Sequence, residues 1–115
     1  MYTVGKTFTF DAAHSLIAPY EGKCAHTHGH TWRVDIVVRA ESLNPCGMVM
    51  DFADFAPLKN YIAQRFDHTT VNATVEQPTA ENIARHLYDY AAGQGWGVVR
   101  VRVWESATAW AEYGR

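Results

Sequence analysis

The chain has 115 residues, of which 48% are apolar and 19% charged, and ten Lys and Arg against twelve Asp and Glu give a formal net charge of -2. This describes one globular domain, residues 1–115, because two separately cored halves would each fall below the roughly 70–80 residues that a hydrophobic core alone stabilises. No basic block and no stretch of roughly 20 apolar residues is present, so neither nucleic acid nor a membrane is an expected partner. With no signal-peptide pattern and only two cysteines, the chain is expected in the reducing cytoplasm.

Two segments in the first half alternate apolar and polar residues, which is typical of half-buried strands. The first covers residues 7–10, Thr-Phe-Thr-Phe, and the second covers residues 31–40. The inward positions of the second are Trp32, Val34, Ile36 and Val38.

Two helices are predicted in the middle of the chain. The first spans residues 54–66, after a turn at residues 44–47, with Asp54 as its N-cap. Its inward residues are Phe55, Leu58, Ile62 and Phe66. The second begins after Thr79 as N-cap and ends at residues 93–95, and its inward residues are Ile83, Leu87 and either Tyr90 or Ala91.

Two further strands complete the chain. Residues 97–105 alternate Val99, Val101 and Val103 with polar or aromatic residues, and residues 109–113 form a shorter strand. The order β-β-α-α-β-β predicts an α+β fold with an antiparallel sheet. Four strands do not close a barrel, which needs about eight, so two sheet edges stay open. Edge pairing between copies of the chain would make a homo-oligomer; charged edge residues are the alternative.

Four of the six histidines lie between His14 and His30. His28 and His30 are two residues apart, so in an extended chain both imidazoles leave the same face and reach one metal ion. His14 follows the first predicted strand, which should pair with the strand that these two open. Three histidines without a fourth protein ligand are typical of a catalytic zinc site. Two alternatives remain: Cys24 closes the site as a fourth ligand, or the histidines are exposed residues that bind nothing.

Three other places offer groups for proton transfer or binding. Cys24 is either a small buried residue or, beside a zinc segment and Lys23, a thiol of lowered pKa that acts as a base. Asp67 and His68 are either a polar pair at a helix end or an imidazole oriented by a carboxylate. Glu105 is either an exposed strand end or a partner for a heterocycle with adjacent amino and ring N–H groups.

Three residues are expected to stay outside the metal shell and the chemistry. His26 shares the parity of the two later histidines and would line the cleft without binding the metal. His86 lies in the second helix among polar neighbours and is predicted to be solvated. Cys46 lies in a turn with no histidine or acid beside it, so no function is predicted for its thiol.

Several segments in order resemble the 6-pyruvoyl-tetrahydropterin synthase family, and most closely its 6-carboxytetrahydropterin synthase branch. Residues 10–16 resemble F-x-A-A-H-x-L, residues 24–30 C-x3-H-G-H, residues 47–52 G-hydrophobic-D-F, residues 66–72 L-D-H-x-x-L-N and residues 78–82 P-T-x-E-N. Glu105, Ser106 and Tyr113 resemble the terminal E-T and Y. Val71 and Ser106 depart from the usual Leu and Thr. The C-x3-H-G-H spacing favours the carboxy branch, and Thr27 argues against a folate branch with glutamate there.

The resemblance implies the tunnelling fold, in which subunits join edges as a trimeric barrel and two trimers stack as a hexamer. It implies that His14, His28 and His30 bind one zinc ion per subunit. Cys24 would be the catalytic base, assisted by Asp67 and His68 from a neighbouring subunit. Glu105 and Ser106 would bind the substrate, Glu105 through the pterin, and Glu105 would also belong to the catalytic set.

The same resemblance implies a lyase reaction. The substrate would be 7,8-dihydroneopterin triphosphate, and the products 6-carboxytetrahydropterin, acetaldehyde and triphosphate, for queuosine or other 7-deazapurines. The alternatives are the pyruvoyl reaction on the same substrate and a non-catalytic scaffold that binds metal or pterin.

Overall fold

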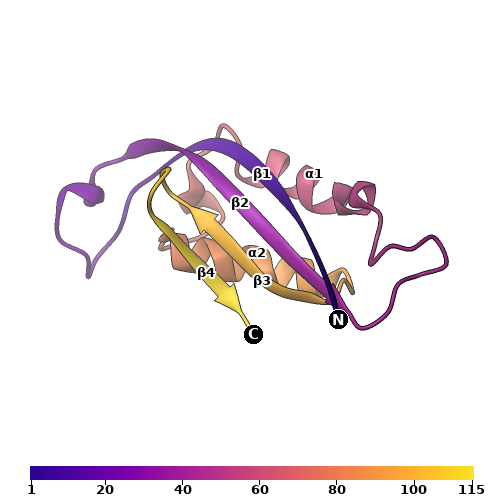
Figure 1. Cartoon of the computed structure of the whole chain (residues 1–115). Coiled ribbons are helices and arrows are strands. Elements are labelled where there is room, and N and C mark those ends of the chain that lie inside the picture. The colour runs from indigo at the N-terminus through magenta and orange to yellow at the C-terminus, as the bar shows by residue number, and fades with distance from the viewer.

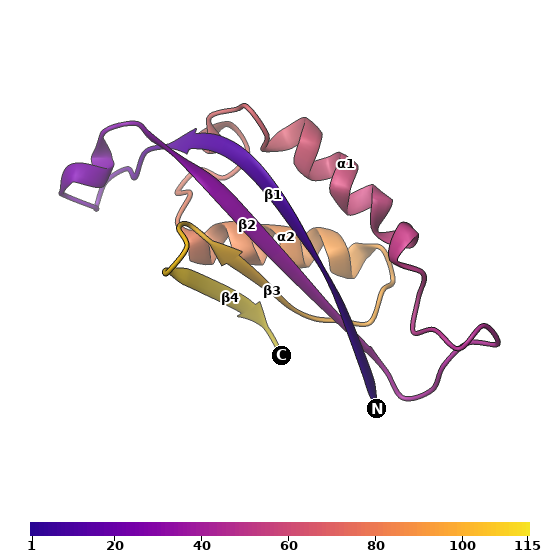
Figure 2. The same cartoon turned by 45° about the horizontal axis from the view of Figure 1, so that its top comes forward.

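The computed structural model describes all 115 residues. Its four strands are β1 (Tyr2–His14), β2 (His28–Ala40), β3 (Val98–Trp104) and β4 (Trp110–Gly114), and they form one antiparallel sheet in that order. Two helices, α1 (Ala56–Arg65) and α2 (Ala80–Gly93), cover one face of the sheet (Figures 1 and 2). The predicted element order and the α+β class are therefore confirmed. Neither helix is long and apolar enough to cross a membrane.

Strands β1 and β2 are both longer than predicted. Each has 13 residues, and their pairing runs without interruption from Tyr2 opposite Ala40 to His14 opposite His28. The prediction for the first strand covered only the Thr-Phe-Thr-Phe alternation of residues 7–10. Gly5 lies within β1, and glycine suits this position because a Cβ there would lie only 2.7 Å from the carbonyl oxygen of Ile36 in the neighbouring strand. The long hairpin runs along the molecule, whose extents are 51 × 25 × 25 Å (Figure 1). His14, His28 and His30 lie at one end of this hairpin.

The core lies between the sheet and the helices and contains almost every residue predicted to point inward. The predicted inward residues of the two helices are buried, with Ala91 rather than Tyr90 at the end of α2. One position in β3 is wrong: Val98 is buried and Val99 is only half-buried. The register of the β2–β3 pairing shifts between Val37 and Val38, and this irregularity reverses the faces of the first residues of β3.

The start of the first helix also differs from the prediction, whereas the start of the second agrees with it. The Asp51 side chain, not that of Asp54, accepts a hydrogen bond from the backbone N–H of Ala53 and begins a short 3-10 turn, Phe52–Phe55. The α-helix follows with Pro57 in its first turn, where the missing N–H of proline costs nothing. Thr79 caps α2 as predicted, since its hydroxyl accepts from the N–H of Asn82.

His86 is half-buried between the helices, so the prediction of a solvated residue is wrong. Its Nε2 lies 2.6 Å from the Tyr61 hydroxyl, and its ring stacks on that of Tyr61. Burial lowers the pKa of His86, against a smaller opposite effect of Asp89. The lowered pKa favours a neutral imidazole, whose Nε2 accepts a hydrogen bond from the Tyr61 hydroxyl.

Acidification is expected to weaken the fold through His86. The unfolded chain, with an ordinary pKa of about 6.5, binds a proton before the folded chain does. The free energy of unfolding is therefore highest above that value and falls as the pH drops toward the lowered pKa. Urea unfolding should show that the free energy of unfolding falls less for His86→Gln than for the wild type when the pH is lowered from about 7.5 to about 5.5. An equal loss of unfolding free energy in both proteins would contradict this expectation. The pKa of His30 is also lowered, but its contribution to the pH dependence is the same in both proteins and cancels in the comparison.

Candidate functional site

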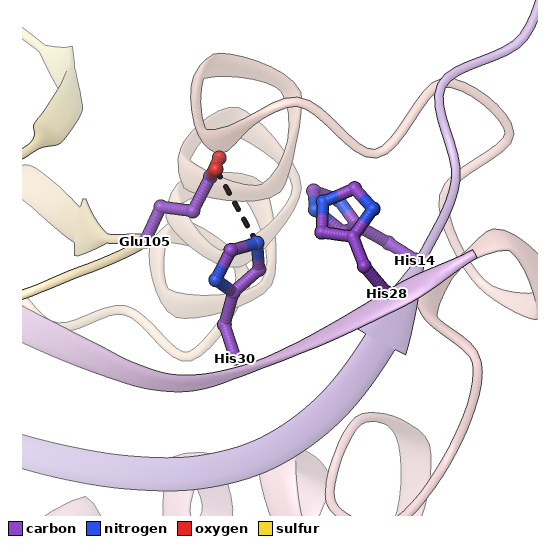
Figure 3. Close-up of side chains that lie close together, drawn as sticks. All are labelled: His14, His28, His30 and Glu105. Carbon is purple, nitrogen blue, oxygen red and sulfur yellow. Dashed lines mark ion pairs between the residues drawn. The ribbon is translucent and has the colours of Figure 1, made fainter. Parts of the chain in front are cut away.

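Three histidines predicted to share a metal come together at the end of the β1–β2 hairpin. His14 is the last residue of β1, opposite His28, and His30 lies two residues further along β2. All three occupy the same alternating positions as buried Trp32, so they point to the helix-covered face. Their ring centroids are 4.5 to 5.1 Å apart (Figure 3). The predicted meeting of three imidazoles is thus present in the fold.

Backbone carbonyls orient two of these rings. His14 Nδ1 lies 2.7 Å from the carbonyl oxygen of Pro78, and His28 Nδ1 lies 2.7 Å from that of His26. Because a carbonyl only accepts, Nδ1 carries the proton in both rings and Nε2 keeps its lone pair. These contacts could not be predicted from the pattern of side chains, because the acceptors are backbone carbonyls. His26 contributes its carbonyl, while its side chain is exposed.

The Nε2 atoms of all three histidines are buried and have no hydrogen-bond partner. An unpaired buried polar atom costs about 1–3 kcal/mol, so three together need an explanation. A bound cation provides one, because it would accept all three lone pairs. Burial also lowers the pKa of His30, although Glu105 opposes this effect, and a lowered pKa favours the neutral form that binds metals.

A fourth donor, Glu105, lies against the histidines. Its Oε1 is 3.4 Å from His30 Nε2, and the ligand atoms of all four residues lie within 4.8 Å of one another (Figure 3). Zn–N and Zn–O bonds of about 2 Å hold ligand atoms roughly 3–4 Å apart, so this spacing suits one zinc ion with little adjustment. The donor set fits a zinc site. Glu105 is two residues from Val103 and four from Val101, so in a strand its side chain lies on the same face as these buried valines. This spacing was a sequence signal that Glu105 faces the histidines, and the prediction did not use it.

Cys24 lines a cavity of about 400 Å³ beside the histidines, together with Lys23, His28, His30 and Glu105. The thiol is half-buried in a short 3-10 turn, Lys23–Ala25, and is not among the four side chains whose ligand atoms lie together. A hydrogen bond with the Cys24 side chain raises the pKa of Tyr20, an exposed neighbour that sequence reasoning did not single out.

Asp67 and His68 lie outside this cavity, beside the outer edge of β1. Asp67 accepts a backbone hydrogen bond from Asp11 through Oδ1 and contacts His68 Nδ1 at 2.9 Å through Oδ2. The bond from Asp11 and the one from His68 lower the pKa of Asp67. The imidazole of His68 is 80% exposed, so one chain presents the pair to its surroundings rather than to its own histidines.

Ser106 forms part of the turn between β3 and β4. Its hydroxyl oxygen accepts backbone hydrogen bonds from Thr108 and Ala109 at 3.4 and 3.2 Å. The backbone N–H of Glu105 donates to the carbonyl of Ala109 in the same turn. The serine therefore fixes the backbone from which the Glu105 side chain projects.

Comparisons with known proteins agree with this arrangement. A sequence profile of the family described as 6-pyruvoyl tetrahydropterin synthase matches residues 3–115. An Archaeoglobus fulgidus protein provisionally named a 6-carboxy-5,6,7,8-tetrahydropterin synthase is 39% identical over 112 residues, 97% of this chain and 95% of that protein. The 6-carboxy-5,6,7,8-tetrahydropterin synthase of a Synechocystis species is 36% identical over 121 residues, 98% of this chain and 93% of that enzyme.

A solved structure has the same fold. The 6-pyruvoyl tetrahydropterin synthase of Caenorhabditis elegans superposes with a TM-score of 0.86 at 23% identity, covering 99% of this chain and 95% of the other. At that identity the likeness concerns the fold alone. The family profile and the two relatives, however, align over nearly the whole length, and this chain therefore belongs to the 6-pyruvoyl tetrahydropterin synthase family of enzymes.

Proposed function

We propose that the protein is a zinc-dependent lyase that converts 7,8-dihydroneopterin triphosphate and water to 6-carboxy-5,6,7,8-tetrahydropterin, acetaldehyde and triphosphate, in the cytoplasm. The observation that carries the metal part of this proposal is the set of three buried, unpartnered Nε2 atoms. The choice of the carboxy product is supported by the names of the relatives and by the C-x3-H-G-H spacing of residues 24–30. The product would serve the synthesis of queuosine or other 7-deazapurines.

His14, His28 and His30 would hold one zinc ion per subunit. A zinc ion there would polarise substrate hydroxyls and acidify the neighbouring C–H bonds. Pro78 and His26 keep the imidazoles of His14 and His28 in the binding tautomer through their carbonyls. The chain thus contributes ligands whose orientation is set before a metal arrives.

Cys24 would take a proton from the substrate side chain, since its thiol lines the same cavity as two of the histidines. Asp67 and His68 would reach this cavity from a neighbouring subunit. Their arrangement supports this, because Asp67 holds Nδ1 of His68 and leaves Nε2 to exchange protons. Glu105 would accept hydrogen bonds from the amino and ring N–H groups of the pterin, and Ser106 would be the second substrate-binding residue.

A homohexamer of two trimers would supply this sharing of residues. The sheet ends in two edge strands, β1 and β4, and pairing such edges between subunits would close a barrel. The exposed imidazole of His68, beside the β1 edge, would then face a neighbouring cavity.

Incubation of the zinc-loaded protein with 7,8-dihydroneopterin triphosphate, without nicotinamide or flavin, tests the reaction. Mass spectrometry should find 6-carboxytetrahydropterin and acetaldehyde. A pyruvoyl product would replace the proposed reaction by the one that gives the family its name. Absence of turnover by a zinc-replete hexamer would contradict both reactions and leave a binding scaffold.

A further inference from the structure

Glu105 lies in a place that its proposed pterin contact does not explain. Its carboxylate points at the histidine cluster, 3.4 Å from Nε2 of His30, rather than into open space beyond it (Figure 3). A pterin held by this carboxylate, with its side chain at the metal, needs a bicyclic ring between the two. No such gap exists while the four ligand atoms lie within 4.8 Å of one another.

We propose that Glu105 is the fourth protein ligand of the metal in the substrate-free protein and leaves the metal when substrate enters. The inference rests on the proposed three-histidine site and goes beyond it. With Glu105 bound, three neutral imidazoles and one carboxylate would make a closed, four-coordinate zinc site. Departure of the carboxylate would open the coordination position that substrate needs.

The charge around Glu105 supports this assignment. Two other carboxylates on the sheet have permanent cations: Asp35 pairs with Arg33 at 3.0 Å, and Glu112 pairs with Arg102 at 2.7 Å. Glu105 contacts only His30 within ion-pair distance, and Lys23 of the same cavity forms no ion pair with it. A partly buried carboxylate needs a positive partner, and a metal ion on the three histidines would be one.

The local structure lets the side chain move without the backbone. The N–H of Glu105 bonds to the carbonyl of Ala109 at 3.0 Å, and the Ser106 hydroxyl closes the same turn. The side chain itself is about one-third exposed and has no hydrogen bond. Its rotation is therefore sufficient to release one partner and take another.

The test compares metal binding by the wild type, Glu105→Gln and Glu41→Gln, an exposed control in the loop after β2. Metal-free protein is titrated with Zn²⁺ against a chelating dye, in the absence of substrate. Mutation of a residue that only hydrogen-bonds to a metal ligand costs about 10–100-fold in metal affinity. Glu105→Gln, which replaces a ligand, should therefore weaken Zn²⁺ binding at least about tenfold. Glu41→Gln should bind as the wild type does.

Co²⁺ in place of Zn²⁺ gives a second readout that does not depend on catalysis. The visible absorption of Co²⁺ reports its ligands, so the spectrum of Glu105→Gln should differ from that of the wild type. Wild-type Zn²⁺ affinity together with an unchanged Co²⁺ spectrum in Glu105→Gln would overturn the inference. His28→Ala separates this failure from that of the proposed function: if it too binds metal normally, the three-histidine site itself is wrong.

Discussion

The His28→Ala variant is expected to lose bound zinc and activity together. Removal of one of three imidazoles leaves the Nε2 atoms of His14 and His30 without a complete site, and the metal affinity should fall by well over about 100-fold. Metal content after gel filtration, together with turnover of the dihydroneopterin substrate, measures both effects. Circular dichroism should show the fold retained, because His28 is only half-buried at the end of the hairpin.

The neighbouring His26→Ala variant is the matched control. The imidazole of His26 is exposed, and the contact of this residue with His28 comes from its backbone carbonyl, which alanine keeps. This variant should retain zinc. Zinc retained by His28→Ala, or lost equally from both variants, would exclude the site built from His14, His28 and His30.

The Cys24→Ala variant is expected to keep zinc but lose activity, whereas His28→Ala loses both. Removal of a positioned base typically costs about 10²–10⁴-fold in rate. Zinc should remain because the Cys24 thiol lies outside the group of four ligand atoms. Metal analysis and steady-state kinetics of the same preparation make the measurement.

Alkylation of the wild type tests the same division of roles from the other side. Cys24 is the half-buried thiol, so its modification is read by peptide mass spectrometry, separately from that of exposed Cys46. A free base should react whether or not zinc is bound. Resistance to alkylation until zinc is stripped, or zinc loss from Cys24→Ala, would make the cysteine a ligand and end its assignment as the base.

The sequence predicted the fold well because local signals agreed with the tertiary structure. Alternation over residues 31–40 and the helical spacing from Phe55 to Phe66 both mark surfaces that the sheet and the helices bury together. The predictions differ from the structure where contacts between residues far apart in the sequence determine whether a side chain is buried. The irregularity opposite Val37 reverses the face of Val98, and Tyr61 draws His86 out of solvent. Neither effect has a signal in the neighbouring residues.

The candidate site was predictable as far as strand geometry extends. The two-residue spacing of His28 and His30, and the pairing of His14 across from them, follow from an antiparallel hairpin. The acceptors of the Nδ1 protons of His14 and His28 were not predictable, because both are backbone carbonyls, which no side-chain pattern marks. The carbonyl of Pro78 also lies 64 positions from His14 in the sequence. The side of the sheet that Asp67 and His68 occupy depends on a loop that pairs with β1 through Asp11.

His68 is held in an unfavourable backbone conformation, with a φ of 56°. A residue with a Cβ pays about 1 kcal/mol or more for this left-handed region, which glycine enters freely. The bond from its N–H to the carbonyl of Asp11, at 2.7 Å, and the contact with Asp67 keep it there. An imidazole at this position is thus retained against the thermodynamic preference of the loop. Selection for heat resistance alone would favour glycine at position 68, and the exposed imidazole that we propose as a proton carrier would be lost in exchange for stability.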